Sequence, residues 1–558
     1  MESIPIYGWL VALAAAMGGF LFGYEMGDIG QVMGMNSFGV EFGIREDEML
    51  NVTLDDGTLL NGTDDRPAMQ YENGTLWVDL DGSYLELTNI TLPRLPETQD
   101  APDIMGSIPF TFLVGCIAGA ACASILADFL GRRYSIFTGS VFYMVGGTMQ
   151  TGCSHLVTLY IGRVVSGIGV GLMSAVVPLY ISETSKTSIR GRLITTFQLM
   201  TAFGVLVACS VNAAILMVLR GDLQWRLALG MQLIPAAVLW LLIILLPFSP
   251  RWLIDRNRDD EALKTLAKLR NLRPDNEKLL AEFATIKENV NYEKTVGNAT
   301  WLELLQPGIR NRVALGITLQ FFQQWTGCNV MLYYGGKVFS AIGMPVIHAF
   351  VTLIILNAGV NFLSTFFAMW LVERIGRKLL LVIGGFLMCL CHALIATFLG
   401  LSVNVQEDLV YGALVFIYLF TMVFAATWGP VVWVYQSEIF PMRVRGKATA
   451  LCTMSNWTWN AIVSKLTPIM LEDIAYYTNV VFSSFCLVMA IFVLIFVPET
   501  KGKNLERMDE IFGSIPEAEA HLDINRNKKI RNIMAQEADK LDGEQLYELQ
   551  PAAQKVVV

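Results

Sequence analysis

Twelve stretches of about 20 mostly apolar residues recur along this chain. An α-helix of that length crosses the hydrocarbon core of a bilayer, so each stretch is long enough to span a membrane. Only 16% of the residues are charged, whereas soluble domains carry about 25%. We therefore predict an all-α membrane protein with twelve transmembrane helices, at 7–27, 105–127, 133–152, 156–180, 192–216, 226–247, 312–336, 345–372, 378–400, 409–436, 446–469 and 475–497.

Clusters of basic residues lie in alternate connections between these stretches, whereas the connections GCSHLV, LSVNVQEDLV and LEDIAYYTN, of opposite parity, carry none. By the positive-inside rule, the basic connections, both termini and the central polar segment are cytoplasmic, which places residues 28–104 outside. Four Asn-x-Thr sequons in that outer segment agree, because N-glycans are added on the extracellular or luminal side. The predicted glycosylation sites are Asn51, Asn61, Asn73 and Asn89.

The net charge of −9 comes from one region. Residues 41–103 hold 15 acidic and 3 basic side chains, a balance of −12, so the rest of the chain is about +3. The charge therefore gives no sign of a nucleic-acid partner. The predicted organisation is the N-terminus with the first span (1–27), a glycosylated outer loop (28–104), the rest of an N-terminal six-helix bundle (105–247), a helical cytoplasmic linker (248–310), a C-terminal six-helix bundle (311–497) and a cytoplasmic tail (498–558).

The two halves repeat each other at their charged ends. LADFLGRRYSIF (126–137) is echoed by LVERIGRKLLLV (371–382), and YISETSKTSIRGR (180–192) by YQSEIFPMRVRGK (435–447). Duplicated six-helix bundles around a pseudo-two-fold axis are the architecture of alternating-access transporters. Charged pairs at these ends could latch the cytoplasmic side, or could only set the topology. The predicted gating charges are Asp128, Arg132, Arg133, Glu183, Arg190, Glu373, Arg377, Glu438, Arg445 and Glu499.

From about residue 8 to 510 the chain resembles the sugar porter family of the major facilitator superfamily. The resemblance is carried, in this order, by GGFLFGYEMG, DFLGRR, GRVVSGIGVGLMSAVVPLYISE, PFSPRWL, QQWTGCNVMLYY, ERIGRK, GPVVWVYQSEIFPMRVRG, SNWTWN and PETKGKNLE. It implies the major facilitator fold and the transport of sugars. In PFSPRWL, Phe248 stands where many members have Glu, which puts the latch at that position in doubt.

The resemblance also assigns sugar contacts within the apolar stretches. A sugar is a ring of hydroxyls with an apolar face, so amides that both donate and accept, together with an aromatic platform, suit it. Single amides in membrane helices can instead join helices to one another. The implied contacts are Gln198, Gln323, Gln324, Asn329, Tyr333, Asn361, Trp433, Asn456, Trp457 and Asn460.

Two carboxylates, Glu25 and Asp28, close the first apolar stretch. A charge at the bilayer centre costs roughly 2.5–3.5 kcal/mol on insertion scales and usually serves a function. The resemblance aligns Glu25 with the acid that pairs with a fourth-span arginine in proton-coupled members, here Arg163. An acid whose distance from an arginine changes with conformation can take up a proton on one side and release it on the other. Asp28 replaces a residue that is usually apolar, and it either tunes Glu25 or marks the helix mouth.

We therefore expect a plasma-membrane importer of monosaccharides, with a hexose such as glucose as substrate, that acts as a proton symporter and a functional monomer. The alternatives are a facilitator of hexose or pentose, a non-transporting sugar sensor, and a porter for another polyhydroxy compound. Catalysis is not expected, because the sequence shows no paired nucleophile and base, no phosphate-binding loop and no metal-ligand cluster. No cofactor is predicted.

Overall fold

The computed structural model describes residues 6–44, 98, 100–186, 189–219, 221–296, 300–330, 355–404, 409–441, 444–501 and 512, and the backbone of five strands between 52 and 88. The four predicted glycosylation sites and Tyr333 lie outside the described residues.

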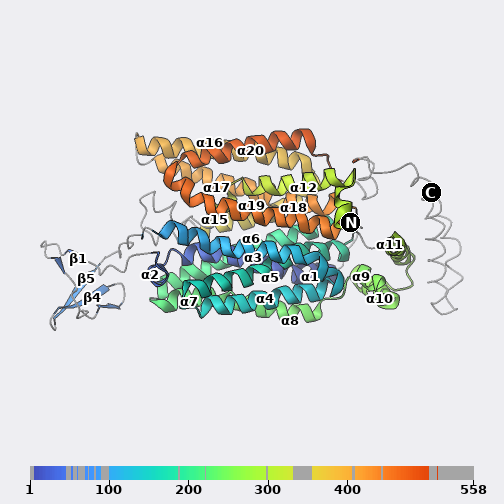
Figure 1. Ribbon diagram of the computed structural model, residues 1–558, viewed down its shortest axis with the longest axis horizontal. Helices are drawn as coiled ribbons and strands as arrows, with labels where there is room; N and C mark the ends of the chain where they lie inside the picture. Colours follow the sequence, from blue (N-terminus) through green and yellow to red (C-terminus); the bar gives the residue numbers. More distant parts are fainter. Residues whose placement is uncertain are drawn as a thin grey trace.

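Long helices lying side by side form the body of the protein (Figure 1). Each of the twelve predicted stretches overlaps at least one of them. The N-terminal half consists of α1 (Ile6–Val32), α3 (Ala101–Phe129), α4 (Arg132–Thr151), α5 (Leu156–Thr184), α6 (Arg190–Val218), α7 (Asp222–Met231) and α8 (Leu233–Leu245). The C-terminal half consists of α12 (Ile309–Gln324), α15 (Ile355–Arg374), α16 (Arg377–Asn404), α17 (Val410–Ala426), α18 (Trp428–Ile439), α19 (Arg445–Asp473) and α20 (Tyr477–Phe496).

Eight helices among the described residues are long and apolar enough to cross a membrane. The other predicted spans fall on α4, α12, α15 and α19, which are helical but shorter or more polar; α12, for example, has 16 residues. The count of twelve spans therefore stays a prediction. The eight are Ile6–Val32, Asp103–Phe129, Leu156–Thr184, Arg190–Val218, Asp222–Leu245, Arg377–Ser402, Tyr411–Ile439 and Tyr477–Phe496.

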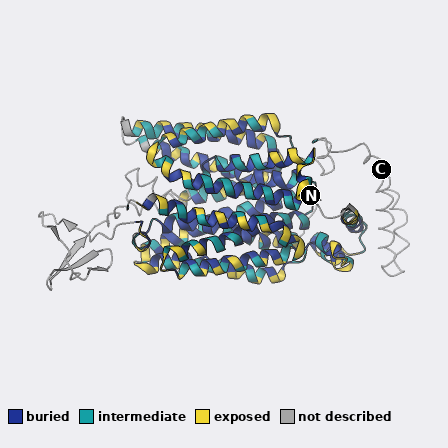
Figure 2. Cartoon of the chain, viewed as in Figure 1, coloured by how far each residue is buried: buried dark blue, intermediate teal, exposed yellow. Residues whose placement is uncertain are grey.

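Burial follows the pattern of a bundle in lipid. Buried residues face the interior between the helices, and exposed ones cover the outer surface (Figure 2). Many of these exposed side chains are large and apolar, such as Leu241 (68% exposed), Phe366 (64%) and Ile495 (65%). A continuous apolar exterior is unfavourable in water and suits the hydrocarbon core of a membrane.

Glycines bring α3 and α5 into backbone contact. Each helix carries a Gly-x-x-x-Gly motif, at Gly115 and Gly119 on α3 and at Gly167 and Gly171 on α5. A Cβ atom added at Gly171 would lie 2.1 Å from the carbonyl oxygen of Cys116, and the other three positions are equally crowded by backbone. Small residues at such spacing let membrane helices approach closely, so these two helices pack as one unit.

Short helices cover one end of the bundle (Figure 1). They are α9 (Pro250–Asp255), α10 (Asp259–Arg270) and α11 (Glu277–Val296), followed by the 3₁₀ helix η2 (Trp301–Leu305). α10 and α11 share a small apolar core that includes Leu266 and Phe283. Arg270 donates to the backbone oxygens of Thr184 (2.9 Å) and Ser185 (3.1 Å), which attaches α10 to the end of α5.

Residues 28–104, whose structure the sequence left open, include the last turn of α1, which ends at Val32, and α2 (Asn36–Glu41). Beyond α2 lie five short strands: β1 (Val52–Thr53), β2 (Leu59–Leu60), β3 (Met69–Glu72), β4 (Thr75–Leu80) and β5 (Ser83–Thr88). β1 pairs with β2, and β3, β4 and β5 form an antiparallel sheet in that order.

Candidate functional site

A cavity lies between the two halves of the bundle. It is lined by α1 and α6 from the N-terminal half and by α12, α15, α17, α18 and α19 from the C-terminal half. Its empty space, including the part open to solvent, is about 780 Å³. Most of the predicted sugar contacts come together here: Gln198, Gln323, Gln324, Asn329, Asn361, Trp433, Asn456 and Asn460.

The predicted contact Trp457 lies behind the cavity wall. Its indole Nε1 donates to Ser174 Oγ of α5 at 3.1 Å. Its ring packs edge-on against Phe22, which does line the cavity, with centroids 5.0 Å apart. In this conformation Trp457 therefore supports a lining residue and joins the two halves.

The side chain of Gln323 is fully engaged with protein. Its Nε2 donates to two backbone oxygens at the start of α18, at 2.8 and 3.2 Å. Its Oε1 accepts from Asn456 Nδ2 at 2.7 Å. Asn456 also donates to Gln320 (2.6 Å), and Gln320 donates to Gln436 (2.6 Å). This chain of buried amides fixes α12, α18 and α19 to one another.

Other amides that line the cavity have side-chain atoms with no hydrogen-bond partner among the described residues. Gln324 Oε1 accepts from Asn329 at 2.8 Å, and Asn361 Oδ1 lies 3.4 Å from Thr365 Oγ1, which donates to the backbone oxygen of Asn361 at 2.8 Å. The side-chain N–H groups of Gln324 and Asn361 have no partner there. Asn460 Oδ1 is buried with no hydrogen-bond partner there. Buried polar atoms without protein partners are costly unless a ligand or water satisfies them. The cavity thus suits a small molecule rich in hydroxyl groups.

Glu25 and Arg163 form a buried ion pair between α1 and α5. Each side chain is 1% exposed, and Arg163 Nη1 donates to Glu25 Oε1. The guanidinium also donates to Gln150 Oε1 (3.3 Å) and to the backbone oxygen of Ile108 (3.4 Å). The second oxygen of Glu25 is buried and has no partner among the described residues. The pair that the resemblance predicts is thus assembled, and its charges are shielded from solvent.

Asp28 lies one turn further along α1 and is also 1% exposed. Its Oδ1 accepts from Asn212 Nδ2 of α6 at 2.7 Å. Asp28 is therefore held inside the bundle by an amide of a neighbouring helix and does not stand at an open helix mouth.

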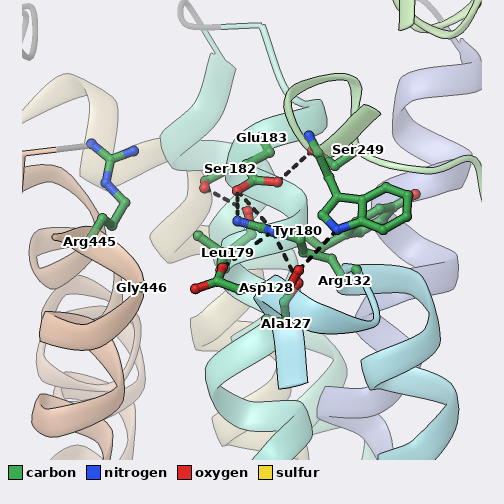
Figure 3. A network of polar contacts seen from close by, with 12 residues as sticks. Ala127, Asp128, Arg132, Leu179, Tyr180, Ser182, Glu183, Ser249, Arg445 and Gly446 are labelled. Atoms are coloured by element: carbon green, nitrogen blue, oxygen red, sulfur yellow. Dashed lines mark hydrogen bonds and ion pairs between the residues drawn. The ribbon is translucent and has the colours of Figure 1, made fainter. Parts of the chain in front are cut away.

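Three of the predicted gating charges of the N-terminal half, Asp128, Arg132 and Glu183, form one network beside α9 (Figure 3). Arg132 at the start of α4 pairs with Glu183 near the end of α5 at 2.9 Å, and with Asp128 at 3.6 Å. Ser249 Oγ donates to the second oxygen of Glu183. Tyr180 donates to the backbone oxygen of Pro247 at 2.7 Å, which holds the chain leading to α9.

The C-terminal half repeats this network. Arg377 donates to Glu438 at 2.7 Å, and Thr500 Oγ1 donates to the other oxygen of Glu438, also at 2.7 Å. Tyr435 donates to the backbone oxygen of Pro498 at 3.2 Å. The two latches therefore correspond residue by residue, with Arg132 matching Arg377, Glu183 matching Glu438, Ser249 matching Thr500, and Tyr180 matching Tyr435.

One position differs between the two latches. Glu499 accepts from the backbone N–H groups of Arg377 (2.9 Å) and Lys378 (3.0 Å), so it caps the N-terminus of α16. The matching residue is Phe248, whose ring lies 5.1 Å from the guanidinium of Arg133 and stacks on Trp252. An aromatic and cation–π contact thus stands where the other half has a carboxylate.

The remaining predicted charges lie around the same end. Arg133 also donates to the backbone oxygen of Ile244 at 3.0 Å. Arg445, which Figure 3 shows on the helix facing the Glu183 network, donates to the backbone oxygen of Phe440 at 3.0 Å. Arg190, half-buried, begins α6.

Ion pairs join the two halves at both ends of the bundle. Near α9–α11, Arg192 of α6 pairs with Glu373 of α15. At the opposite end, Lys465 of α19 contacts Asp103 (3.1 Å) and Ser107 (3.2 Å) of α3. The sequence analysis did not single out the second contact. The cavity therefore lies between two sets of bonds that hold the halves together.

The described residues contain no cluster of three or more His, Cys, Asp or Glu that could hold a metal ion.

The model of the family described as "Sugar (and other) transporter" matches residues 11–512. The chain is 33% identical over 516 residues to the hexose transporter HXT9 of Saccharomyces cerevisiae, covering 90% of this chain and 82% of that one. It is 31% identical to the high glucose sensor RGT2 of the same yeast, covering 94% of this chain and 62% of the sensor.

Among solved structures, this one is similar to the proton:xylose symporter XylE of E. coli bound to 6-bromo-6-deoxy-D-glucose. The TM-score is 0.73 at 27% identity, over 91% of this chain and 100% of that one. That protein has the major facilitator fold, so this part of the predicted fold is confirmed, and the count of twelve transmembrane helices stays a prediction.

Proposed function

We propose that this protein, which belongs to the sugar transporter family, imports monosaccharides, foremost hexoses such as glucose, by alternating access. Members of this family are transporters and not enzymes. The observation that carries the proposal is the cavity between the halves, where amides from both halves meet around a partly unsatisfied polar interior. The eight lining residues predicted from the sequence are proposed to contact the sugar, and Tyr333 and Trp457 stay predictions.

The protein is further proposed to cross the plasma membrane twelve times, as a monomer, with α9–α11 and both termini in the cytoplasm and residues 28–104 glycosylated outside. The alternation of basic residues along the sequence supports this topology. In this assignment the Arg192–Glu373 pair joins the halves on the cytoplasmic side, where the two latches connect helix ends within each half, and Lys465 and Asp103 join the halves outside.

Transport is proposed to be coupled to protons through Glu25. Its single cationic partner among the described residues is Arg163, and both lie in helices of the N-terminal half that contact or adjoin the cavity wall. A change in the distance between the two side chains during the transport cycle would change the proton affinity of the carboxyl group.

Radiolabelled glucose uptake in cells that lack their own hexose carriers tests both proposals. Uptake is expected to be faster at pH 5 than at pH 7.5, to fall when a protonophore is added, and to lose its pH dependence in Glu25→Gln. Uptake indifferent to pH and protonophore would make the protein a facilitator. Absence of uptake of every monosaccharide, with the protein at the cell surface, would favour a sensor, the second candidate suggested by the similarity to a glucose sensor.

The pair between the halves provides a test of gating. Arg192→Glu is expected to lower the initial uptake rate up to about fivefold, because it replaces an attraction worth roughly 0–1 kcal/mol by a repulsion. The exchange Arg192→Glu with Glu373→Arg should recover most of the rate, because it restores the pair with its charges reversed. A double variant no better than the single one would contradict the gating role.

A further inference from the structure

The cavity contains a polar pair that is not among the predicted sugar contacts. Asn357 of α15 and Thr421 of α17 both line it. Thr421 Oγ1 donates to Asn357 Oδ1 at 2.7 Å, and also contacts the backbone oxygen of Ile417 at 3.1 Å. Asn357 lies four residues before Asn361, so the two amides share one face of α15, with their Cβ atoms about 5–6 Å apart.

The hydrogen bond from Thr421 determines which atoms of the Asn357 side chain can bind a ligand in the cavity. Because Oδ1 accepts from Thr421, the Nδ2 group keeps two N–H donors, which have no partner within the described part of the chain. Asn361 Nδ2 likewise has no partner there: Thr365 Oγ1 donates to the backbone oxygen of Asn361 at 2.8 Å and lies 3.4 Å from its Oδ1. Two amide nitrogens, one helical turn apart, are therefore available to the same cavity. Their spacing allows them to meet two different hydroxyl groups of one sugar.

The wall around this pair is aromatic. Phe420 and Phe424, on either side of Thr421 in sequence, also line the cavity, and their rings stack with centroids 6.3 Å apart. A hydrogen bond beside apolar rings is less exposed to competing water, so it contributes more to selectivity than one at an open surface. The rings also offer an apolar surface to the apolar face of a sugar.

We propose that Asn357 and Thr421 form an additional hydroxyl-recognition site, in which Asn357 Nδ2 donates to one hydroxyl of the bound monosaccharide and Thr421 holds the amide in the donating orientation. This inference rests on the proposed function and deepens it by naming specificity-determining residues. A site built to hydrogen-bond a hydroxyl rejects an analogue that lacks it, because the polar group of the site is then left unpaired.

The competing explanation is that the pair only joins α15 to α17. Such a role predicts that removing it lowers the amount or the stability of the protein and affects all sugars alike. Recognition of one hydroxyl predicts instead an effect that depends on which hydroxyl the sugar carries.

The test compares Asn357→Ala, Thr421→Val and the control Thr421→Ser, which keeps the hydroxyl. Half-saturation constants are measured for glucose, for each of its monodeoxy analogues and for xylose, which lacks the hydroxymethyl group. Asn357→Ala should raise the constant for glucose about three- to tenfold, the loss of one hydrogen bond, and should leave it unchanged for the analogue that lacks the contacted hydroxyl. Thr421→Val should show a smaller rise, and Thr421→Ser should match the wild type.

The double variant Asn357→Ala with Thr421→Val should be no worse than Asn357→Ala alone, because both changes remove the same contact. An equal loss for every sugar, or unchanged constants in both variants, would overturn the inference while leaving sugar transport by the wild type intact. Wild-type protein that takes up no sugar would instead overturn the proposed function. If Asn357→Ala fails to reach the membrane, the comparison of Thr421→Val with Thr421→Ser across the same sugars still distinguishes hydroxyl recognition from a purely structural role.

Discussion

Arg163→Leu is expected to abolish transport and to leave little folded protein, because it removes the cationic partner of Glu25. Both side chains are 1% exposed, so the remaining carboxylate would be buried without a counter-charge. Removing one partner of a buried ion pair typically costs about 3–5 kcal/mol. Against a total stability of about 5–15 kcal/mol, this is a large share. Thermal unfolding of the purified protein and its amount at the cell surface measure the effect.

Two matched variants separate the effect of the unpaired charge in Arg163→Leu from the effect of the lost side-chain volume. Arg163→Leu combined with Glu25→Leu should unfold at a higher temperature than Arg163→Leu alone, because apolar replacement of a whole buried pair is often close to neutral. Glu25→Gln should lower the unfolding temperature less than Arg163→Leu, because the guanidinium keeps the amide oxygen, Gln150 Oε1 and the backbone oxygen of Ile108 as acceptors. A single Arg163→Leu variant as stable as the wild type would show that Gln150 or another group compensates, and the pair would then have no structural role.

Gly171→Ala is expected to disrupt the N-terminal half through a single added carbon. That carbon would lie 2.1 Å from the carbonyl oxygen of Cys116, so the backbones of α3 and α5 must separate to admit it. Overpacking costs typically 1–3 kcal/mol and occasionally more, and here the obstacle is backbone, which has no alternative rotamer. We expect a clear drop in unfolding temperature and reduced surface expression.

Gly359→Ala is the matched control for this prediction. The same substitution within α15 meets no atom within 4 Å among the described residues. Alanine is favoured over glycine inside a helix by roughly 0.5–1 kcal/mol, so this variant should be as stable as the wild type or slightly more stable. Equal behaviour of the two variants would contradict the view that α3 and α5 are in backbone contact.

For the two latches, the sequence predicted the positions of the charged clusters but not the pairs that form within them. The repeated motifs predicted charged clusters at matching places in the two halves, and the structure contains them. The motifs did not reveal the pairing. Glu183 binds Arg132 of another motif, although Arg190 lies in its own, because the helix ends of α4 and α5 meet in space. Likewise, the substitution at Phe248 could be seen in the sequence, but its stacking and cation–π contacts could not.

The residues that line the cavity were harder to predict from the sequence than those of the latches. A polar residue in an apolar stretch indicates that it meets something polar, but only the packing of neighbouring helices decides whether it faces a partner or a cavity. Asn357, Thr421 and Gln436 could not be assigned from their own helices for this reason. The resemblance named Trp457, which lies behind Phe22 in this conformation. The Gly-x-x-x-Gly motifs of α3 and α5, by contrast, are a sequence signal that could have predicted close packing.

The chain of amides behind Gln323 has a consequence for how substrate is captured. Because Gln323 already bonds to α18 and α19, it loses little conformational entropy when a ligand binds, and the free energy of binding is reduced little by ordering this side chain. The C-terminal half therefore presents a stiff, preorganised wall. Gln198 on α6 has no such anchorage among the described residues, so adjustment to the ligand falls to the approach of the N-terminal half. The hydrogen-bonding groups of the C-terminal half are then in place before closure, and the closure itself supplies the contacts of the N-terminal half.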